Sequence, residues 1–190
     1  DEKLFFCIGD VSGKGVPAAL VMAVTRTLFR NVASHTDKPA HIVDTMNANI
    51  TEGNDNQMFV TLFVGVLDLA SGRLSYCNGG HNAPYIQDVT LPVEPNLPVG
   101  AWADWQFVEQ ETVIRSGETI FLYTDGLTEA ENASQEQFGE DRTTEVIAAQ
   151  TKQSASPQAL IDAMTNAVHE FVGDTEQSDD LTMLAIRFSK

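Results

Sequence analysis

Aspartate stands at the boundary of an apolar, strand-like run in three places that are far apart in the sequence. The three segments are Ile8-Gly9-Asp10, Tyr123-Thr124-Asp125-Gly126 and Ser178-Asp179-Asp180-Leu181. Carboxylates at strand ends can converge at one edge of a sheet, where their mutual repulsion would force some of them to protonate. A divalent cation removes that penalty, and oxygen ligands with few histidines favour Mg²⁺ or Mn²⁺ over zinc. One interpretation of the pattern is therefore a shared metal centre.

A metal centre of this kind would suit the hydrolysis of phosphate esters. Two divalent ions about 3.5–4 Å apart can share a bridging water and lower the pKa of that water towards neutrality. The resulting hydroxide is a nucleophile for phosphorus, and the metal charge offsets the negative charge on the phosphoryl oxygens. Such a mechanism requires no serine or cysteine nucleophile.

Each of these aspartates also has an ordinary structural interpretation. An aspartate before glycine at a strand end is a common turn former, which fits Asp125. Asp10 could cap the helix that is predicted after it. Asp179 and Asp180 could form a solvated acidic surface beside Glu176. From spacing alone, the metal centre and these local roles both stay open.

The charge balance excludes several other classes of function. The 190 residues include 11 Lys+Arg and 27 Asp+Glu, which gives a formal net charge of −16 at pH 7. Nucleic-acid binding requires clustered cations, and the chain contains no basic run, so we expect no nucleic-acid partner. The same lack of cations argues against docking on an anionic membrane surface. No apolar stretch reaches the roughly 18 residues that a membrane span requires, so we expect no membrane insertion.

The two cysteines indicate packing rather than chemistry. Cys7 and Cys77 both lie in apolar runs and cannot form a disulfide framework. The chain has no CxxC and no HExxH motif, which argues against a zinc site. The start at Asp1 shows neither the basic nor the apolar region of a signal peptide. These features predict a cytoplasmic protein.

The elements that must position the aspartates alternate between strands and helices. Strand patterns cover Leu4–Ile8, Met58–Leu69, Arg73–Cys77, Pro84–Gln87, Phe107–Ile114, Thr119–Tyr123 and Leu181–Phe188. Helical patterns cover Pro17–Arg30, Pro39–Ile50, Thr143–Gln150 and Pro157–Val172, with polar loops at 51–57 and 129–141. Strands joined by hairpins, with helices in pairs, predict an α+β layered fold with antiparallel sheets.

Five local motifs occur along the chain: Gly9-Asp10-Val11-Ser12-Gly13-Lys14-Gly15-Val16-Pro17-Ala18-Ala19, Asn78-Gly79-Gly80-His81-Asn82-Ala83-Pro84, Leu97-Pro98-Val99-Gly100, Phe121-Leu122-Tyr123-Thr124-Asp125-Gly126-Leu127-Thr128-Glu129-Ala130 and Asp179-Asp180-Leu181-Thr182. In sequence and in order they closely resemble the motifs of the SpoIIE/RsbU branch of the bacterial metal-dependent protein serine/threonine phosphatases, which belongs to the PPM, or protein phosphatase 2C-like, superfamily. Five ordered motifs that span nearly the whole chain are far more specific than any one of them.

The resemblance implies a four-layer α-β-β-α sandwich of two antiparallel sheets flanked by helix pairs, in a single domain over residues 1–190. It implies two Mn²⁺ or Mg²⁺ ions and hydrolysis of phosphoserine or phosphothreonine on a protein. By this resemblance Asp10 is similar to the aspartate that bridges both metals, and Val11 offers a backbone carbonyl to one of them. Asp125 and Asp179 match the remaining catalytic metal ligands, with Asp180 as the alternative register for the last one.

The resemblance also implies partners. The substrate would be a phosphorylated regulatory protein, an anti-anti-sigma factor of the STAS type whose dephosphorylation releases a sigma factor. Such domains usually follow an N-terminal sensor or receiver domain. Family members also carry an earlier strand with a Gly-Gly-Asp motif, whereas this chain begins at Asp1. We therefore expect an N-terminally truncated chain without that first strand, whose exposed sheet edge invites pairing with another chain, as in a homodimer.

Two other functions fit the same residues. A catalytically weak, phosphatase-like interaction module in a signalling protein is favoured by the missing first strand and opposed by the three aspartates. A metal-dependent phosphodiesterase for small molecules would share the metal chemistry. His81, within the glycine loop, is either a loop residue whose ring bonds to the backbone or a general acid for the leaving serine oxygen.

Overall fold

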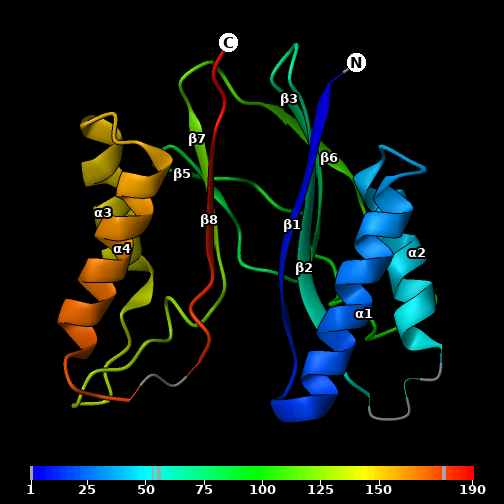
Figure 1. The fold of residues 1–190 in the computed structure, drawn as a ribbon, viewed down its shortest axis with the longest axis horizontal. Helices are drawn as coiled ribbons and strands as arrows, with labels where there is room; N and C mark the ends of the chain where they lie inside the picture. The colour runs from blue at the N-terminus through cyan, green and yellow to red at the C-terminus, as the bar shows by residue number, and fades with distance from the viewer. Residues whose placement is uncertain (1, 53, 55–56, 177–178) are drawn as a thin grey trace. The chain divides into compact units, whose positions relative to one another are not determined.

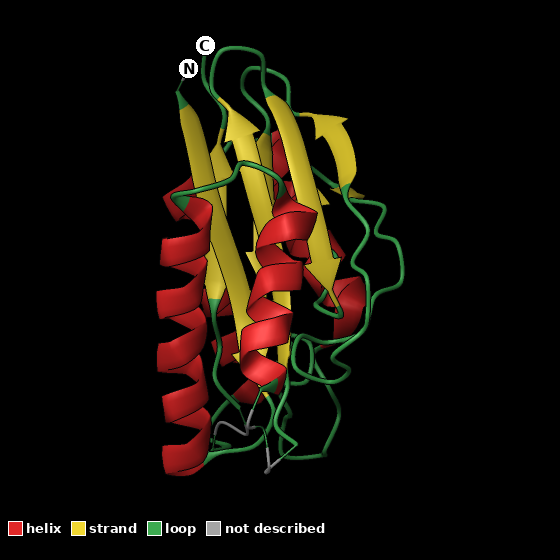
Figure 2. Ribbon diagram, turned by 90° about the vertical axis from the view of Figure 1, so that its right-hand side faces the viewer, coloured by secondary structure: helices red, strands yellow, loops and turns green. Residues whose placement is uncertain are grey.

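The computed structural model describes residues 2–52, 54, 57–176 and 179–190. The chain divides into two compact units. The first contains Asp1–His81 and Pro92–Val113, and the second contains Asn82–Leu91 and Ile114–Lys190. Each unit has one antiparallel sheet with a pair of helices on one face (Figure 1, Figure 2).

The first unit contains a four-stranded sheet in the order β1-β2-β3-β6. Its strands are β1 (Lys3–Val11), β2 (Val60–Asp68), β3 (Arg73–Gly79) and β6 (Gln110–Val113), and its helices are α1 (Gly15–Ala33) and α2 (Pro39–Thr51). The two helices pack against each other and against β1 and β2 (Figure 1). The strands β2 and β3 form the hairpin that the turn at Gly72 predicts.

Alternation along β1 decides which side chains face the helices. Phe5, Cys7 and Val11 pack into the core that α1 and α2 share with the sheet. Because successive residues of a strand point to opposite faces, Asp10 lies on the face away from the helix pair. The strand therefore fixes the direction of this carboxylate through the apolar residues on either side of it.

The second unit contains a four-stranded sheet in the order β5-β4-β7-β8. Its strands are β4 (Tyr85–Ile86), β5 (Val89–Thr90), β7 (Thr119–Tyr123) and β8 (Met183–Arg187), and its helices are α3 (Gly139–Lys152) and α4 (Pro157–Val172). The helices bury Ile147 and Met164 against Phe121 and Tyr123 of β7. This core holds the β7–β8 pair, whose end carries the later acidic motifs.

These elements confirm the predicted α+β class with two antiparallel sheets flanked by helix pairs. The predicted helix at 143–150 is longer than expected, because its first turn begins at Gly139 and includes two acidic residues that favour a helix N-terminus. The short strand β5 was not predicted. The predicted loop at 51–57 includes residues 53, 55 and 56, and the Ser178-Asp179-Asp180-Leu181 motif includes residue 178, all of which lie outside the described residues.

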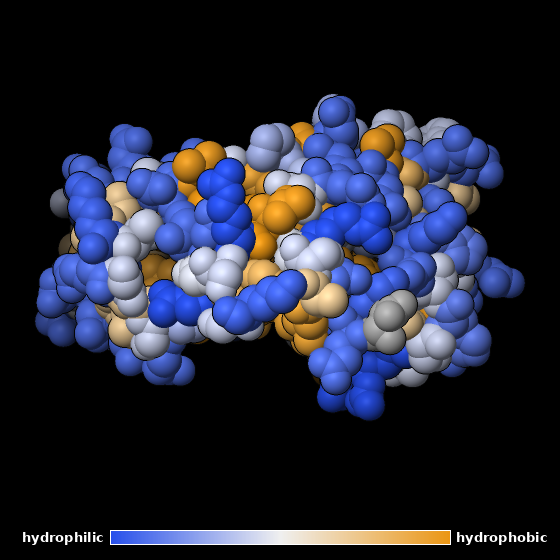
Figure 3. Space-filling model, turned by 90° about the horizontal axis from the view of Figure 1, so that it is seen from above, coloured by the Kyte–Doolittle hydropathy of each residue, from blue (hydrophilic) through white to orange (hydrophobic). Residues whose placement is uncertain are grey.

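The surface agrees with the strongly acidic composition. Hydrophilic side chains cover most of the face in Figure 3, and apolar side chains form smaller groups among them. The largest exposed apolar side chains of α1 are Val16, Leu20 and Val24, which recur every fourth residue on one side of the helix. Within the described residues, no helix combines the length and the apolar character that crossing a membrane requires.

Candidate active site

The end of β1 brings Asp10 and Val11 to the outer strand of the first sheet. Val60 lies opposite Val11 in the β1–β2 register, but it exchanges both of its backbone hydrogen bonds with Val99, at 2.8 Å each. In an antiparallel pair, two opposed residues that do not bond each other point their backbone groups outwards. The carbonyl of Val11 therefore points to the outer edge of β1, where a hard oxygen ligand could meet a cation.

A glycine-rich turn leads the chain from this strand into α1. Gly13 and Gly15 have φ angles of +84° and +79°, which side chains with a Cβ adopt only at a cost. Ser12 ties the turn to the residue before β2: its backbone N–H donates to the Phe59 carbonyl at 2.8 Å, and its Oγ accepts from the Phe59 N–H at 2.9 Å. The motif therefore fixes the exit from the strand that carries Asp10.

The glycine-histidine loop is held by one asparagine. The Asn78 Oδ1 accepts the backbone N–H of His81 at 2.7 Å, and the Asn78 Nδ2 donates to the His81 carbonyl at 2.8 Å. The imidazole Nδ1 of His81 lies 3.0 Å from the hydroxyl of Thr61. Both His81 and Asn78 are buried. The loop's backbone contacts therefore run through Asn78, whereas the imidazole contacts a side-chain hydroxyl.

In the second unit, the end of β7 runs beside the segment that precedes β8. Tyr123 is paired with Met183, and the Thr124 N–H continues the ladder to the Thr182 carbonyl at 3.0 Å. The Thr124 hydroxyl donates to the Asp180 carbonyl at 3.0 Å and accepts from the Thr182 N–H at 3.1 Å. This buried threonine thus fastens the acidic segment to the strand end.

Gly126 makes the closest approach between the two acidic motifs. A Cβ placed on Gly126 would lie only 2.4 Å from the Asp180 carbonyl oxygen and 3.4 Å from the Asp179 carbonyl carbon. The neighbouring residue, Asp125, accepts the Glu129 N–H at its carbonyl at 2.8 Å. The structure therefore brings Asp125 together with Asp179 and Asp180 at one end of the second sheet.

The predicted ligands are therefore distributed over two places. The segments that carry Asp125 and Asp179 lie side by side in the second unit, and Asp10 and Val11 are neighbours in β1 of the first. Within residues 2–52, 54, 57–176 and 179–190, no group of three or more His, Cys, Asp or Glu side chains is arranged to hold a metal ion. The donors present are carboxylates and one edge carbonyl, a chemistry that fits Mg²⁺ or Mn²⁺. The ligand assignment stays a prediction.

A cavity of about 380 Å³ lies beside the acidic end of the second unit. Gly126 and Leu181 form part of its wall, Val172 closes it from α4, and Glu131 and His169 add polar groups. This volume is typical of pockets that take small ligands or side chains. Sequence patterns did not indicate Glu131 or His169 as cavity residues, because the cavity depends on how the end of α4 packs.

Burial makes the thiols and one phenol poor nucleophiles. Burial raises the pKa of the Cys77 thiol to about 12 and that of the Cys7 thiol to about 11. Burial likewise raises the pKa of Tyr123 well above its usual range. Thiols that stay protonated near neutral pH do not act as nucleophiles, so both cysteines have a packing role in the core.

Comparison with known proteins assigns the chain a family. The profile of the family described as "Stage II sporulation protein E (SpoIIE)" matches residues 1–189. The chain is 30% identical to the Protein IcfG of Synechocystis sp. over 217 residues, covering 98% of this chain and 34% of that protein. It is 26% identical to the Phosphoserine phosphatase RsbU of Bacillus subtilis over 133 residues, covering 67% of this chain and 40% of that protein. The chain thus spans well under half the length of these relatives.

Solved structures with the same fold cover nearly the whole chain. The SiaA-PP2C domain of Pseudomonas aeruginosa aligns with a TM-score of 0.84 at 20% identity, covering 98% of this chain and 80% of that one. The RsbU and RsbW domains of Rv1364c from Mycobacterium tuberculosis align with a TM-score of 0.76 at 27% identity, covering 98% of this chain and 52% of that one. RsbX in complex with magnesium aligns with a TM-score of 0.69 at 17% identity, covering 100% and 83%.

Proposed function

This chain belongs to the SpoIIE family, a branch of the PPM phosphatases, and from that premise we propose that it hydrolyses phosphoserine or phosphothreonine on a protein with the help of Mn²⁺ or Mg²⁺. The observation that carries the proposal is the close approach of Gly126 to the Asp180 backbone, which supports a shared site for the neighbouring residues Asp125 and Asp179. The names of two relatives support the reaction, since RsbU and RsbP of Bacillus subtilis are both phosphoserine phosphatases. The magnesium in the RsbX structure supports the choice of metal.

We assign the metal ligands to the residues that the motifs single out. The carboxylates of Asp10, Asp125 and Asp179 and the carbonyl of Val11 would hold two divalent ions. Bound metal would supply a water of lowered pKa and offset the charge on the phosphoryl oxygens. The chain's own contribution is to hold these oxygens in place. The Thr124 hydroxyl donates to the carbonyl of Asp180 and so fixes the segment that carries Asp179.

The substrate belongs to this proposal as well. We assign it to a phosphorylated regulatory protein of the STAS anti-anti-sigma type. Residues 1–190 would form the phosphatase domain of a larger cytoplasmic protein, behind a sensor or receiver domain, and a homodimer is the expected assembly. The chain covers 34% of IcfG and 40% of RsbU, which agrees with a domain of a longer protein.

A second candidate is a catalytically weak module that keeps the fold and binds partners. It is favoured by one observation, because no group of three acidic, histidine or cysteine side chains forms a metal site among the described residues. Such a module would bind the regulatory protein and leave its phosphate in place. The two candidates therefore differ in turnover and not in binding.

Hydrolysis assays with and without Mn²⁺ separate the two candidates. We expect the chain to release phosphate from a phosphoserine STAS protein in the presence of Mn²⁺, and EDTA to stop the reaction. The Asp125→Asn variant should lose roughly 100-fold in kcat or more while it unfolds in urea like the wild type. Asp162→Asn, at an exposed position of α4, is the matched control and should keep full activity. Activity that survives excess EDTA would exclude the metal mechanism, and binding without turnover would favour the interaction module.

A further inference from the structure

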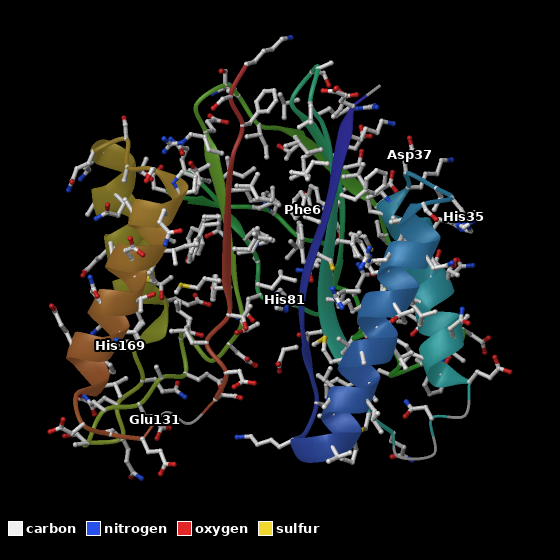
Figure 4. All side chains as sticks on the ribbon, in the orientation of Figure 1. Phe6, His35, Asp37, His81, Glu131 and His169 are labelled. Carbon is white, nitrogen blue, oxygen red and sulfur yellow. The ribbon has the colours of Figure 1, made fainter. Side chains whose placement is uncertain are left out.

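Three neighbouring segments place polar side chains on the same face of the first sheet. Val60 and Leu62 of β2 pack into the core shared with α1 and α2, so Thr61 between them points to the opposite face. Asp10 lies on that face too, directly opposite Thr61 in the β1–β2 register. The His81 ring reaches the same place from the loop that follows β3 (Figure 4).

The Thr61 hydroxyl lies between a histidine and the backbone of a proposed metal ligand. Its Oγ1 is 3.0 Å from His81 Nδ1 and 3.4 Å from the Asp10 carbonyl oxygen. A hydroxyl donates one proton and accepts through two lone pairs. When His81 donates from Nδ1, the hydroxyl proton of Thr61 turns to the Asp10 carbonyl. When His81 accepts at Nδ1, that proton turns away from Asp10. The proton position on His81 therefore decides whether the Thr61 hydroxyl adds a side-chain hydrogen bond to the Asp10 carbonyl, beyond the backbone pairing of β1 with β2.

The loop around His81 is built to keep the imidazole fixed. Asn78 binds both backbone groups of His81, at 2.7 and 2.8 Å. Gly80 has a φ of +70°, and a Cβ on it would lie 3.0 Å from Pro98, so the loop packs closely against Pro98 at this position. Only 6% of His81 is exposed to solvent. A solvent-exposed loop histidine would not need such support.

We propose that His81 and Thr61 form a positioning pair, which fixes the end of β1 so that Asp10 meets a divalent cation in a single orientation. This inference rests on the proposed function, because it takes Asp10 as a metal ligand. His81 acts here through Thr61 and does not contact the substrate. Removal of a group that orients a metal ligand by hydrogen bonding commonly lowers the metal affinity by about 10- to 100-fold.

Isosteric variants of Thr61 test the pair directly. Thr61→Val removes the hydroxyl at nearly constant shape, whereas Thr61→Ser keeps it. We expect calorimetry to show Mn²⁺ binding weakened about 10-fold in Thr61→Val and close to wild type in Thr61→Ser. The Mn²⁺ concentration needed for half-maximal hydrolysis should shift in parallel, with kcat at saturating metal changing less. Urea unfolding of each variant shows whether a loss belongs to the site or to the fold.

A double-mutant cycle tests whether the two residues act together. His81→Ala alone should weaken Mn²⁺ binding as much as Thr61→Val alone, and the double variant should be no worse than either. Losses that multiply in the double variant would show independent roles and overturn the pair. Mn²⁺ affinity unchanged in Thr61→Val would also overturn it, while leaving the proposed function intact. A wild-type chain that neither binds Mn²⁺ nor hydrolyses phosphoserine would overturn both.

The leaving group distinguishes positioning from general acid catalysis by His81. A general acid protonates the leaving oxygen, so its loss harms a serine ester far more than a p-nitrophenyl ester, whose leaving group needs no proton. Positioning predicts that His81→Ala slows both substrates by the same factor at limiting Mn²⁺. A loss confined to the phosphoserine substrate, with Mn²⁺ affinity unchanged, would overturn the positioning role.

Discussion

Adding one methyl group at Gly126 should displace the acidic end of the second unit. The Cβ of an alanine would lie 2.4 Å from the Asp180 carbonyl oxygen and 2.9 Å from its carbonyl carbon, whereas ordinary contact begins at 3.4 Å. Both neighbours are backbone atoms that cannot rotate away, so the Asp180 peptide must retreat by about 1 Å. A misplacement of that size in a catalytic group can cost about 100-fold in rate. We expect Gly126→Ala to lose about this factor in Mn²⁺-dependent kcat and about 1–3 kcal/mol of stability.

The matched control for this variant is Gly117→Ala in the same unit. Gly117 has a φ of +89°, so alanine costs about 1–2 kcal/mol in backbone strain. No atom lies within 4 Å of the added Cβ, so nothing is displaced. Hydrolysis of p-nitrophenyl phosphate over a Mn²⁺ titration, together with urea unfolding, then separates the two effects. We expect similar losses of stability and a loss of turnover in Gly126→Ala alone. Wild-type kcat and Mn²⁺ dependence in a folded Gly126→Ala protein would refute the reasoning.

Substitutions at two further positions, Cys77 and Ser156, test the fold. Burial raises the pKa of Cys77 from 9.0 to about 12, so the unfolded chain loses this proton first and the free energy of unfolding falls as pH rises from about 9 towards 12, by about 1.4 kcal/mol per unit. Cys77→Ala should reduce the slope in urea titrations across that range, with the part due to Cys7 remaining, and an unchanged slope would contradict the burial of Cys77. Ser156→Ala removes the Oγ that accepts the Ala159 N–H at 3.1 Å and should cost about 1 kcal/mol with turnover unchanged. Ser156→Thr should restore the stability, and if it does not, the cap is not the cause.

Local sequence signals predicted those helices that have capping residues at their ends. The helix α4 was predicted from end to end because Ser156 caps it and Gly173, with a φ of 62°, ends it. The helix α3 begins earlier than predicted, since Phe138 stands at its N-cap without a side-chain bond. The first-turn acids Glu140 and Asp141 were the only remaining signal there, and they resemble loop residues in a polar stretch.

The site could be predicted only as far as its motifs are local in sequence. The position of Asp125 at the end of β7 follows from the strand and turn that contain it. The contact between Thr61 and His81 depends instead on the β1–β2 register and on the loop after β3. Thr61 looks like any other residue of an apolar strand, and nothing in its neighbours marks it. Pairings of this kind are set by tertiary structure, which single-sequence patterns do not contain.

The two hydrogen bonds between Asn78 and the His81 backbone also affect the chemical degradation of the protein. Asparagine followed by glycine is the pair most prone to deamidation, because the glycine nitrogen can attack the side-chain amide and close a succinimide ring. In the Asn78-Gly79 pair, the amide oxygen is held by the His81 N–H and the amide nitrogen by the His81 carbonyl, in a site that is 3% exposed. The folded chain therefore protects the bond that would decay soonest in the unfolded chain, and storage under destabilising conditions would damage this loop first.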